Sequence, residues 1–336
     1  MGRAWPAGGA LTETGRLHKA ASRPRYHGPL CGDPKNLIKA HDRAVVVASI
    51  ATGSRFARGK MTKTLRKSLR KFAIATPLLV LGFYFVPILT TIFIVCGLID
   101  VLRNDRKDLS LFSGYFLGNG LFTWLLSPFN LLVDLLCYRN PGVWKLEQFP
   151  QDYQREVNEV LDIFKARKDE IIADIDANFG AGRRGMYVYQ WYGKHRIDNV
   201  PEFNKDFKYI KTIAVSVFSK RESTSWHFGP LRLSLRILYN LIPVKAEIFV
   251  ECGNVKNYWY DNPQFIFDDT LLHRSVNEYD GRRYCVFMDI IRPSPFPRLI
   301  AGMLAVVSVS VERINSMFYK NWKMIGSSKP KKVETT

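Results

Sequence analysis

The stretch "FDDTLLHRSVNEYDGRRYCVFMDIIRP", residues 267–293, places His273 and Arg283 ten residues apart, on either side of "NEYDG". The dipeptide Asp280-Gly281 is typical of a β-hairpin turn. In such a hairpin, residues 273 and 283 would be cross-strand partners, with side chains on one face and Cβ atoms about 5 Å apart. We therefore expect Arg283 to project beside His273.

A histidine next to a guanidinium suits a metal ligand whose bound molecule also carries a carboxylate. A small dicarboxylate could chelate the metal at one end and form a bidentate salt bridge at the other. Two histidines with open metal positions fit non-haem Fe(II) better than structural zinc. The spacing alone does not show that His273 binds a metal, since a single histidine on a strand is more often a core residue. Of the six histidines, two lie within the β-rich region (His227, His273), three lie near the N-terminus and one lies in a polar loop (His18, His27, His41, His195).

The β-rich region begins near Gly185. Short runs rich in Val, Ile, Tyr and Phe alternate there with Gly, Pro and Asn, for example "MYVYQWY", "YIKTIAVSVF", "AEIFVE", "QFIF" and "YCVFMDI". Such spacing is typical of an antiparallel barrel or sandwich. The preceding stretch, up to Gly180, has helical spacing of its apolar residues. We expect residues 138–295 to form a mainly β domain, a double-stranded β-helix of the jelly-roll or cupin-like kind, with a packed N-terminal helix.

Four segments then carry a resemblance. In order, "STSWHFGP", "LSLR", "FDDTLLHRSV" and "GRRYCVFMDIIRP" resemble the aspartyl/asparaginyl β-hydroxylase family of Fe(II)/2-oxoglutarate dioxygenases, over roughly residues 150–295. The order and gaps match those of the family: a histidine, an arginine nine residues on, a second histidine 46 residues after the first, and an arginine ten residues after that. The resemblance implies that oxygen and 2-oxoglutarate are consumed, that succinate and CO2 are released, and that a C–H bond is hydroxylated.

The resemblance also implies roles for particular residues. His227 and His273 match the iron ligands of the family. Arg283 matches the arginine that grips the distal carboxylate of 2-oxoglutarate. Ser216 matches a serine that hydrogen-bonds this co-substrate, and Arg236 matches a second basic contact to it.

Two positions bear on these assignments. Many related oxygenases have Asp or Glu two residues after the first histidine, whereas this chain has Gly229, as in the part of the family where water fills that position. We interpret the nearby carboxylates Asp268 and Asp269 as turn residues before His273. Leu238 stands where the family usually has a histidine that contacts the co-substrate, so a degenerate oxygenase is an alternative.

Residues 61–137 are expected to form a membrane anchor. The uncharged run 72–99 exceeds the roughly 20 residues that span a bilayer. A second run, 109–133, contains Gly, Pro and Asn and could be a second span or a re-entrant segment. The six cations of residues 60–71 should stay in the cytoplasm. We favour a hairpin or a re-entrant segment over one span; a buried helix of a soluble domain is the other alternative.

The termini are less regular. Residues 1–60 lack a core-forming pattern and are predicted to be a disordered basic leader, with Met61 a plausible start of the working chain. Of the net charge of +19, +13 lies in residues 1–71, and because it adjoins an apolar run we expect an anionic phospholipid bilayer rather than nucleic acid as partner. Residues 296–336 begin with an apolar stretch too short to span, which is expected to dock on the bilayer or to pack on the barrel.

One further stretch narrows the function. "FTWLLSPFNLLVDLLCYRNPGVWKLEQFP" resembles the segment between anchor and catalytic domain in bacterial lipid A acyl-chain 2-hydroxylases; related enzymes act on ornithine lipids. The resemblance implies a dioxygenase of the bacterial inner membrane that faces the cytoplasm and hydroxylates an acyl chain of a membrane lipid. The first alternative is a β-hydroxylase of Asp or Asn in peptides or proteins. The second is a non-catalytic lipid-binding protein on an oxygenase fold.

Overall fold

The computed structural model describes residues 66, 69–71, 73–180, 182–318 and 323–325. The chain divides into two units, residues 1–65 and 66–336, and everything below concerns the second. The expectation of a disordered leader at residues 1–60 lies outside the described residues.

The described strands form two sheets. The larger sheet has the order β1-β8-β5-β10-β4-β2-β11, with β3 paired to β2, and the smaller has the order β7-β6-β9. The strands of the larger sheet are β1 (Val143–Trp144), β2 (Arg184–Trp191), β3 (Lys194–His195), β4 (Ile210–Phe218), β5 (Ser234–Asn240), β8 (Gln264–Phe267), β10 (Arg283–Ile291) and β11 (Lys323–Ile325). Those of the smaller are β6 (Ile248–Cys252), β7 (Val255–Tyr258) and β9 (His273–Asn277).

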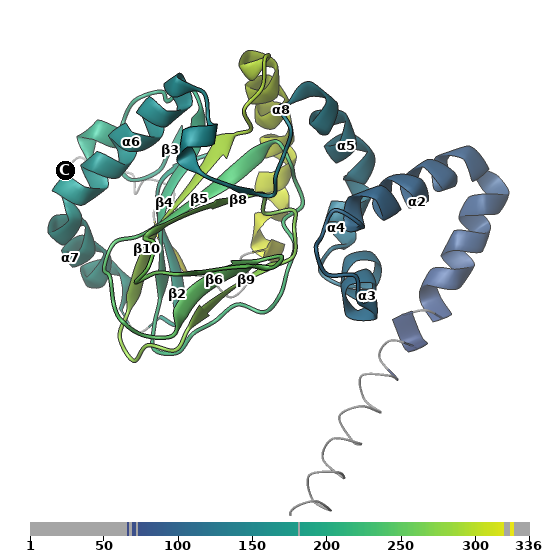
Figure 1. Cartoon of the computed structure of the whole chain (residues 1–336), viewed down its shortest axis with the longest axis horizontal. Helices are drawn as coiled ribbons and strands as arrows, with labels where there is room; N and C mark the ends of the chain where they lie inside the picture. The colour runs from purple at the N-terminus through teal and green to yellow at the C-terminus, as the bar shows by residue number, and fades with distance from the viewer. Residues whose placement is uncertain (1–65, 67–68, 72, 181, 319–322, 326–336) are drawn as a thin grey trace, which may run out of the picture. The chain divides into compact units, whose positions relative to one another are not determined.

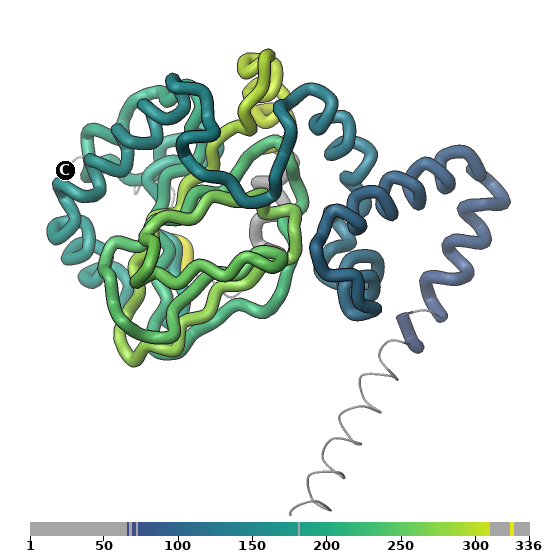
Figure 2. Tube along the Cα trace, in the orientation of Figure 1, coloured from purple at the N-terminus to yellow at the C-terminus, as the bar shows by residue number. Residues whose placement is uncertain are grey.

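The smaller sheet lies opposite part of the larger one, as the cartoon and the Cα trace both show (Figures 1 and 2). The prediction of a mainly β, cupin-like domain with helices before it is therefore confirmed at this level. The expected hairpin is wrong, because β9 pairs with β6, whereas β10 pairs with β4 and β5. His273 is thus opposite Cys252, and Arg283 is opposite Phe218. The "NEYDG" segment connects the two sheets rather than two neighbouring strands.

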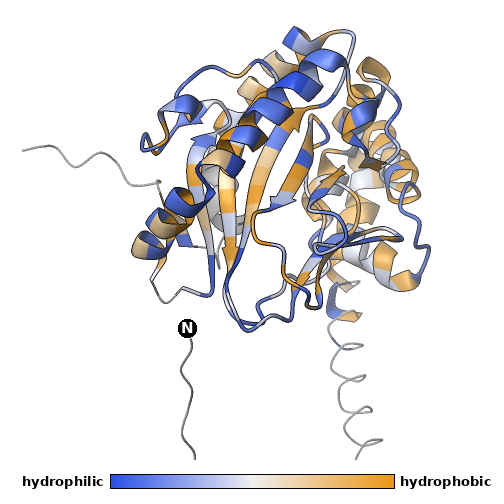
Figure 3. Cartoon of the chain, turned by 60° about the vertical axis from the view of Figure 1, so that its left-hand side comes forward, coloured by the Kyte–Doolittle hydropathy of each residue, from blue (hydrophilic) through white to orange (hydrophobic). Residues whose placement is uncertain are grey.

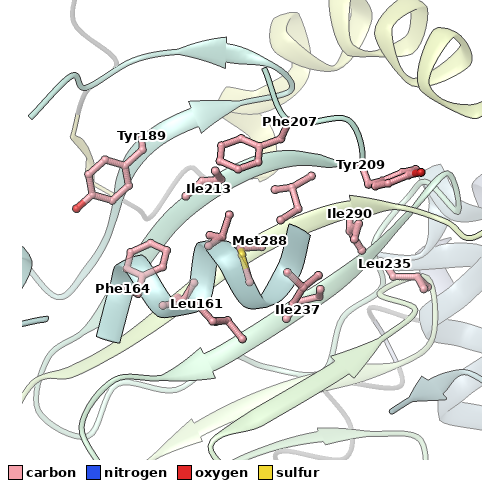
Figure 4. Close-up of a cluster of buried hydrophobic side chains, with 14 of the residues drawn as sticks. Leu161, Phe164, Tyr189, Phe207, Tyr209, Ile213, Leu235, Ile237, Met288 and Ile290 are labelled. Atoms are coloured by element: carbon pink, nitrogen blue, oxygen red, sulfur yellow. The ribbon is translucent and has the colours of Figure 1, made fainter. Parts of the chain in front are cut away.

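Both faces of the larger sheet are buried. Because successive side chains of a strand point to opposite faces, alternate residues belong to two separate apolar clusters. In β10, Val286, Met288 and Ile290 belong to a cluster that includes residues of the helix α6 (Gln151–Ala166). Cys285 and Phe287 belong to a second cluster inside the sandwich. Figure 4 shows the first cluster, with side chains of this helix, β2, β4, β5 and β10 meeting one another. The second cluster lines the interior where the two sheets face each other.

Two helices, rather than the one expected, cover the outer face. They are α6 (Gln151–Ala166) and α7 (Lys168–Phe179), separated at Arg167, and a 3-10 turn lies on either side of them in sequence (Leu146–Gln148, Pro201–Phe203). Gly180 ends α7 with φ of +63°, a conformation that favours glycine. Figure 3, in which this face comes forward, shows hydrophilic residues on the outer side of these helices and hydrophobic strands behind them.

The expected membrane span at residues 72–99 is not a continuous helix. Residues 73–85 are helical, Val86 has the non-helical angles φ −139° and ψ 62°, and α2 (Pro87–Val101) then begins. The break has a local cause, since a proline disfavours helical geometry in the residue before it. Within the described part of the chain, no helix combines the length and the apolar character needed to cross a membrane.

The second apolar run is divided too, into α3 (Leu109–Leu117), α4 (Leu121–Leu125) and α5 (Ser127–Leu136). Polar side chains attach these helices to the β domain. Thr123 Oγ1 donates to the carbonyl of Gly229 at 2.9 Å, and Asn130 donates to the carbonyl of Pro230 at 3.1 Å. These helices therefore contact the segment that follows His227.

The C-terminal apolar stretch is part of α8 (Pro297–Phe318). Ile300 and Leu304 are buried in the cluster on the outer face of the sheet. Leu299, Val306 and Val309 of the same helix are exposed. One side of the helix thus packs on the domain, and another presents apolar side chains to its surroundings.

Candidate active site

The two candidate iron ligands face each other. Residues 223–227 run antiparallel to β9, and His227 and His273 exchange both backbone hydrogen bonds at 3.0 Å. Directly opposed residues of such a pair carry their side chains on one face. The imidazole rings accordingly lie 4.1 Å apart between centroids.

Both imidazoles are held in the same tautomer. Nδ1 of His227 lies 2.7 Å from the carbonyl oxygen of Ser225, and Nδ1 of His273 lies 2.9 Å from that of Leu271. Because a carbonyl oxygen only accepts, each Nδ1 must donate, which leaves the lone pair of a neutral ring on Nε2. In the described part of the chain, neither Nε2 has a hydrogen-bond partner.

Electrostatics also favours neutral rings. Burial lowers the pKa of His227, and nearby Arg236 acts in the same direction. Burial lowers the pKa of His273 well below its usual value, helped by the proximity of His227. Neutral imidazoles with free Nε2 atoms are the form that binds a metal, and a backbone bond at Nδ1 is the usual way of orienting such a ligand. The pair therefore fits Fe(II), although the described residues contain no group of three or more His, Cys, Asp or Glu side chains suited to a metal.

A carboxylate occupies the space beside Gly229. A Cβ atom built at position 229 would lie 2.4–2.6 Å from the carboxyl group of Asp269, and the backbone N–H of Gly229 donates to the carbonyl oxygen of Asp269 at 2.6 Å. The side chain of Asp269 thus fills the place from which a residue two positions after His227 would project. The chain needs glycine there because any side chain would collide with this carboxylate.

Asp269 is not the simple turn residue expected. It is buried and forms an ion pair with Arg236 at 2.9 Å. Burial, with smaller contributions from Asp289 and Asp268, raises the pKa of its carboxyl group to about 7 against the opposing effect of Arg236. Arg236 pairs with Asp289 as well, at 3.0 Å, and lies over the ring of Phe287. The Arg236 guanidinium thus forms ion pairs with two carboxylates of the protein, those of Asp269 and Asp289.

Arg283 differs from Arg236 in having no acidic side chain beside it among the described residues. Its guanidinium is buried, donates to Ser275 Oγ at 2.7 Å and lies 4.2 Å from the ring centre of Phe218. No carboxylate of the described residues forms an ion pair with it, and Nε has no hydrogen-bond partner there. Burial accordingly lowers its pKa, with only the Cys285 thiol opposing. An anion bound beside this guanidinium would offset the cost of burying its charge.

Strand register places the remaining candidates on the interior face. Ser216 is opposite Cys285, and its hydroxyl donates to the carbonyl of that residue at 3.1 Å. Leu238 is opposite Phe287 and lies in the interior apolar cluster, so no polar group replaces the histidine expected at that position. Arg283 lies on the same face, two residues from Cys285.

Ser275 was not expected from the sequence, yet it connects the two parts of the site. It lies on β9 two residues after His273, on the same face, so about 7 Å of strand separates them. Its hydroxyl accepts from Arg283. The spacing is one that a five-carbon dicarboxylate can bridge. The sequence did contain one indication of this contact: Ser275 is a polar residue two positions after His273 in the same strand, so both side chains lie on one face.

Comparisons with known proteins agree with the sequence motifs. Residues 194–293 match the family model described as Aspartyl/Asparaginyl beta-hydroxylase, and this segment includes His227, Arg236, His273 and Arg283. This is a family of Fe(II)/2-oxoglutarate hydroxylases. No curated protein sequence matches the chain.

Parts of this chain are also similar to solved structures. A cupin domain from Bordetella pertussis Tohama I is 14% identical, with 33% of this chain and 98% of that chain covered and a TM-score of 0.21. A prolyl hydroxylase in complex with a hypoxia inducible factor peptide fragment, from Trichoplax adhaerens, is 15% identical, with 51% and 93% covered and a TM-score of 0.25. A recombinant oxalate oxidase in complex with glycolate is 15% identical, with 42% and 75% covered and a TM-score of 0.24.

Proposed function

We propose that the protein is an Fe(II)- and 2-oxoglutarate-dependent hydroxylase. One observation carries the proposal: buried Arg283 has no carboxylate partner among the described residues and is linked through Ser275 to the strand that carries His273. A dicarboxylate co-substrate would supply the missing anion at one end and reach the histidine pair at the other. The family match supports the same chemistry.

In this proposal His227 and His273 hold Fe(II) through Nε2, with their orientation set by the bonds from Nδ1 to backbone carbonyls. Bound iron supplies the activation of oxygen that C–H hydroxylation requires. Arg283 and Ser275 bind the distal carboxylate of 2-oxoglutarate. Ser216 lines the same face, so its hydroxyl is positioned to contact the co-substrate after rotating away from the carbonyl of Cys285.

Asp269 has a proposed role that does not involve ligation. Its carboxylate lies beside Gly229 and is held by Arg236. From there it can accept a hydrogen bond from water at the position that a third protein ligand would otherwise occupy. Leu238 stands in place of a polar residue, so Arg236 is the proposed second basic contact of the co-substrate. This contact would require the Arg236 guanidinium to bind the co-substrate in addition to Asp269 and Asp289, with which it already forms ion pairs.

For the substrate, the family match favours β-hydroxylation of Asp or Asn side chains in a peptide or protein. The acyl chain of a membrane lipid is a second candidate, favoured by a separate observation. The helical residues before β1 expose a long series of large apolar side chains, including Phe83, Phe85, Ile88, Leu89 and Leu135. A surface of this kind suits contact with a bilayer, which would then be a partner.

The test is turnover of 2-oxoglutarate to succinate by the purified full chain with Fe(II) and oxygen, followed by mass spectrometry of two substrate pools. A gain of one oxygen on Asp- or Asn-containing peptides supports the first candidate, and the same gain on acyl chains of membrane lipids supports the second. Absence of both 2-oxoglutarate binding and iron binding would overturn the proposal and favour a non-catalytic protein.

A further inference from the structure

The loop between α2 and α3 contacts several segments that surround the histidine pair. Residues 103–106, here called the latch loop, each bond to a different part of the β domain. Arg103 forms an ion pair with Asp268 at 3.1 Å. Asn104 Oδ1 accepts from the backbone N–H of Leu272 at 2.8 Å. Leu272 directly precedes His273, so this bond fixes the backbone at one ligand.

The next residue of the latch loop acts on the turn between β6 and β7. Asp105 Oδ2 accepts from the backbone N–H of Asn254 at 3.2 Å, and its carboxylate lies so close to Gly253 that a Cβ atom there would meet it at 2.5 Å. The N–H of Gly253 in turn donates to the carbonyl of Leu272 at 3.1 Å. Both backbone groups of Leu272 are thus held, directly or through this turn, by the latch loop.

Arg106 reaches the residues beside both ligands. Its guanidinium lies 4.1 Å from the ring centre of Trp226 and pairs with Glu251 at 3.1 Å. Glu251 also pairs with Arg274 at 2.8 Å, and the guanidinium of Arg274 lies 4.6 Å from the same Trp226 ring. Trp226 precedes His227 and Arg274 follows His273. Trp226 and Glu251 each contact both guanidinium groups, and so connect the neighbours of the two ligands.

The other end of the latch loop is firmly attached. Asp100, the buried residue three positions before Arg103, forms an ion pair with Arg232 and accepts a hydrogen bond from Tyr115 at 2.6 Å. Arg232 also lies 3.4 Å from Asp268, the residue paired with Arg103. The burial of Asp100, Arg232 and Asp268 makes this a costly arrangement to break. The helices before the β domain are thus joined to it by buried charges close to the site.

We propose that the latch loop, residues 103–106, contains positioning residues for the metal site. None of its side chains bonds a histidine, and each acts through a residue next to a ligand or through the segment that supports one. The inference rests on the proposed function, because it assigns the histidine pair to a metal. It adds that the helical segment before β1 preorganises the site, so a chain without this segment would lose metal affinity even if it folded.

The test compares full-length variants Asn104→Ala, Arg106→Ala and Arg106→Lys with Arg167→Ala. Arg167 is the matched control, since it also pairs with carboxylates, Glu170 and Glu202, but lies between α6 and α7 and away from the site. The first readout is Co(II) affinity, measured by visible absorption. The second is amide hydrogen exchange of the metal-free protein at residues 226–229 and 268–274.

We expect Asn104→Ala and Arg106→Ala each to weaken Co(II) binding by about threefold to tenfold, less than the loss of a direct partner of a ligand, because both residues act through a neighbour of a histidine. Arg106→Lys should fall between wild type and alanine, since it keeps the charge but loses the planar stack on Trp226. Exchange should rise at the two segments and not elsewhere.

Unchanged Co(II) affinity with unchanged exchange would overturn the proposal, as would a rise in exchange spread over the whole domain, which indicates general destabilisation. If the wild-type chain itself binds no Co(II), the proposed function fails. The exchange pattern would still decide whether the latch loop orders the histidine segments.

Discussion

Replacing Arg283 with methionine should make the metal-free protein more stable while abolishing its response to 2-oxoglutarate. The guanidinium is buried with one hydroxyl partner, one aromatic neighbour and no carboxylate among the described residues. A buried charge in such surroundings is kept at a cost to stability. Methionine has similar length and no charge, so the variant removes that cost together with the proposed anion contact.

The expected size follows from three opposing contributions. Burying a charge costs several kcal/mol after relaxation. The hydrogen bond to Ser275 returns about 1.5–3 kcal/mol, and the stack on Phe218 returns about 0.5–2 kcal/mol. A net gain of about 1 kcal/mol is therefore expected for Arg283→Met, which is about 2–4 °C in Tm for a domain of this size. In wild type, 2-oxoglutarate at about 100 times its Kd should add about 2.7 kcal/mol.

The assay is thermal unfolding with and without 2-oxoglutarate, in metal-free and Co(II)-loaded protein. Arg184→Met is the matched control, because Arg184 is aligned with Arg283 across Phe218 but has the buried Glu222 as its partner at 2.6 Å. That variant should lose about 1 kcal/mol, since it removes one of the two arginine partners of a buried carboxylate, the other being Arg183. The reasoning is refuted if Arg283→Met destabilises the metal-free protein as Arg184→Met does, or if 2-oxoglutarate still raises its Tm.

Three further outcomes are expected. His227→Ala and His273→Ala should each abolish Co(II) binding detected by visible absorption, with circular dichroism unchanged; retention of wild-type affinity by either would remove that ligand. Arg103 and Arg232, outweighing burial, hold the pKa of Asp268 far below its unfolded value of about 3.9, so its contribution to stability is present above about pH 4 and is lost as the pH falls further. Asp268→Asn should therefore cost more in urea unfolding at pH 7 than at pH 3, and an equal cost at both would contradict this assignment. A chain limited to residues 138–295 should show no cooperative unfolding, because it lacks α2–α5 and α8, and a sharp transition would show that they are dispensable.

Much of this protein was determined by local sequence. Short runs rich in Val, Ile, Tyr and Phe, separated by Gly, Pro and Asn, predict strands such as β2, β4 and β10, because these residue types favour an extended backbone. Gly180 ends α7 through its own backbone freedom. The order and spacing of His227, Arg236, His273 and Arg283 identified the family motif without knowledge of their neighbours.

Pairing and burial depend on residues distant in sequence, so only the tertiary structure decided them. "NEYDG" has the composition of a hairpin turn, yet β9 and β10 enter different sheets, because closing a sandwich makes pairing with β6, β4 and β5 more favourable than local pairing. The same closure brings Ser275, rather than His273, to the Arg283 guanidinium. Asp269 has the sequence context of a turn residue, whereas the structure places its carboxylate in the space beside Gly229, forty residues away along the chain. Neither the latch loop nor the buried ion pairs of Arg232 could be read from the sequence, since charge pairing over more than a hundred residues leaves no local pattern.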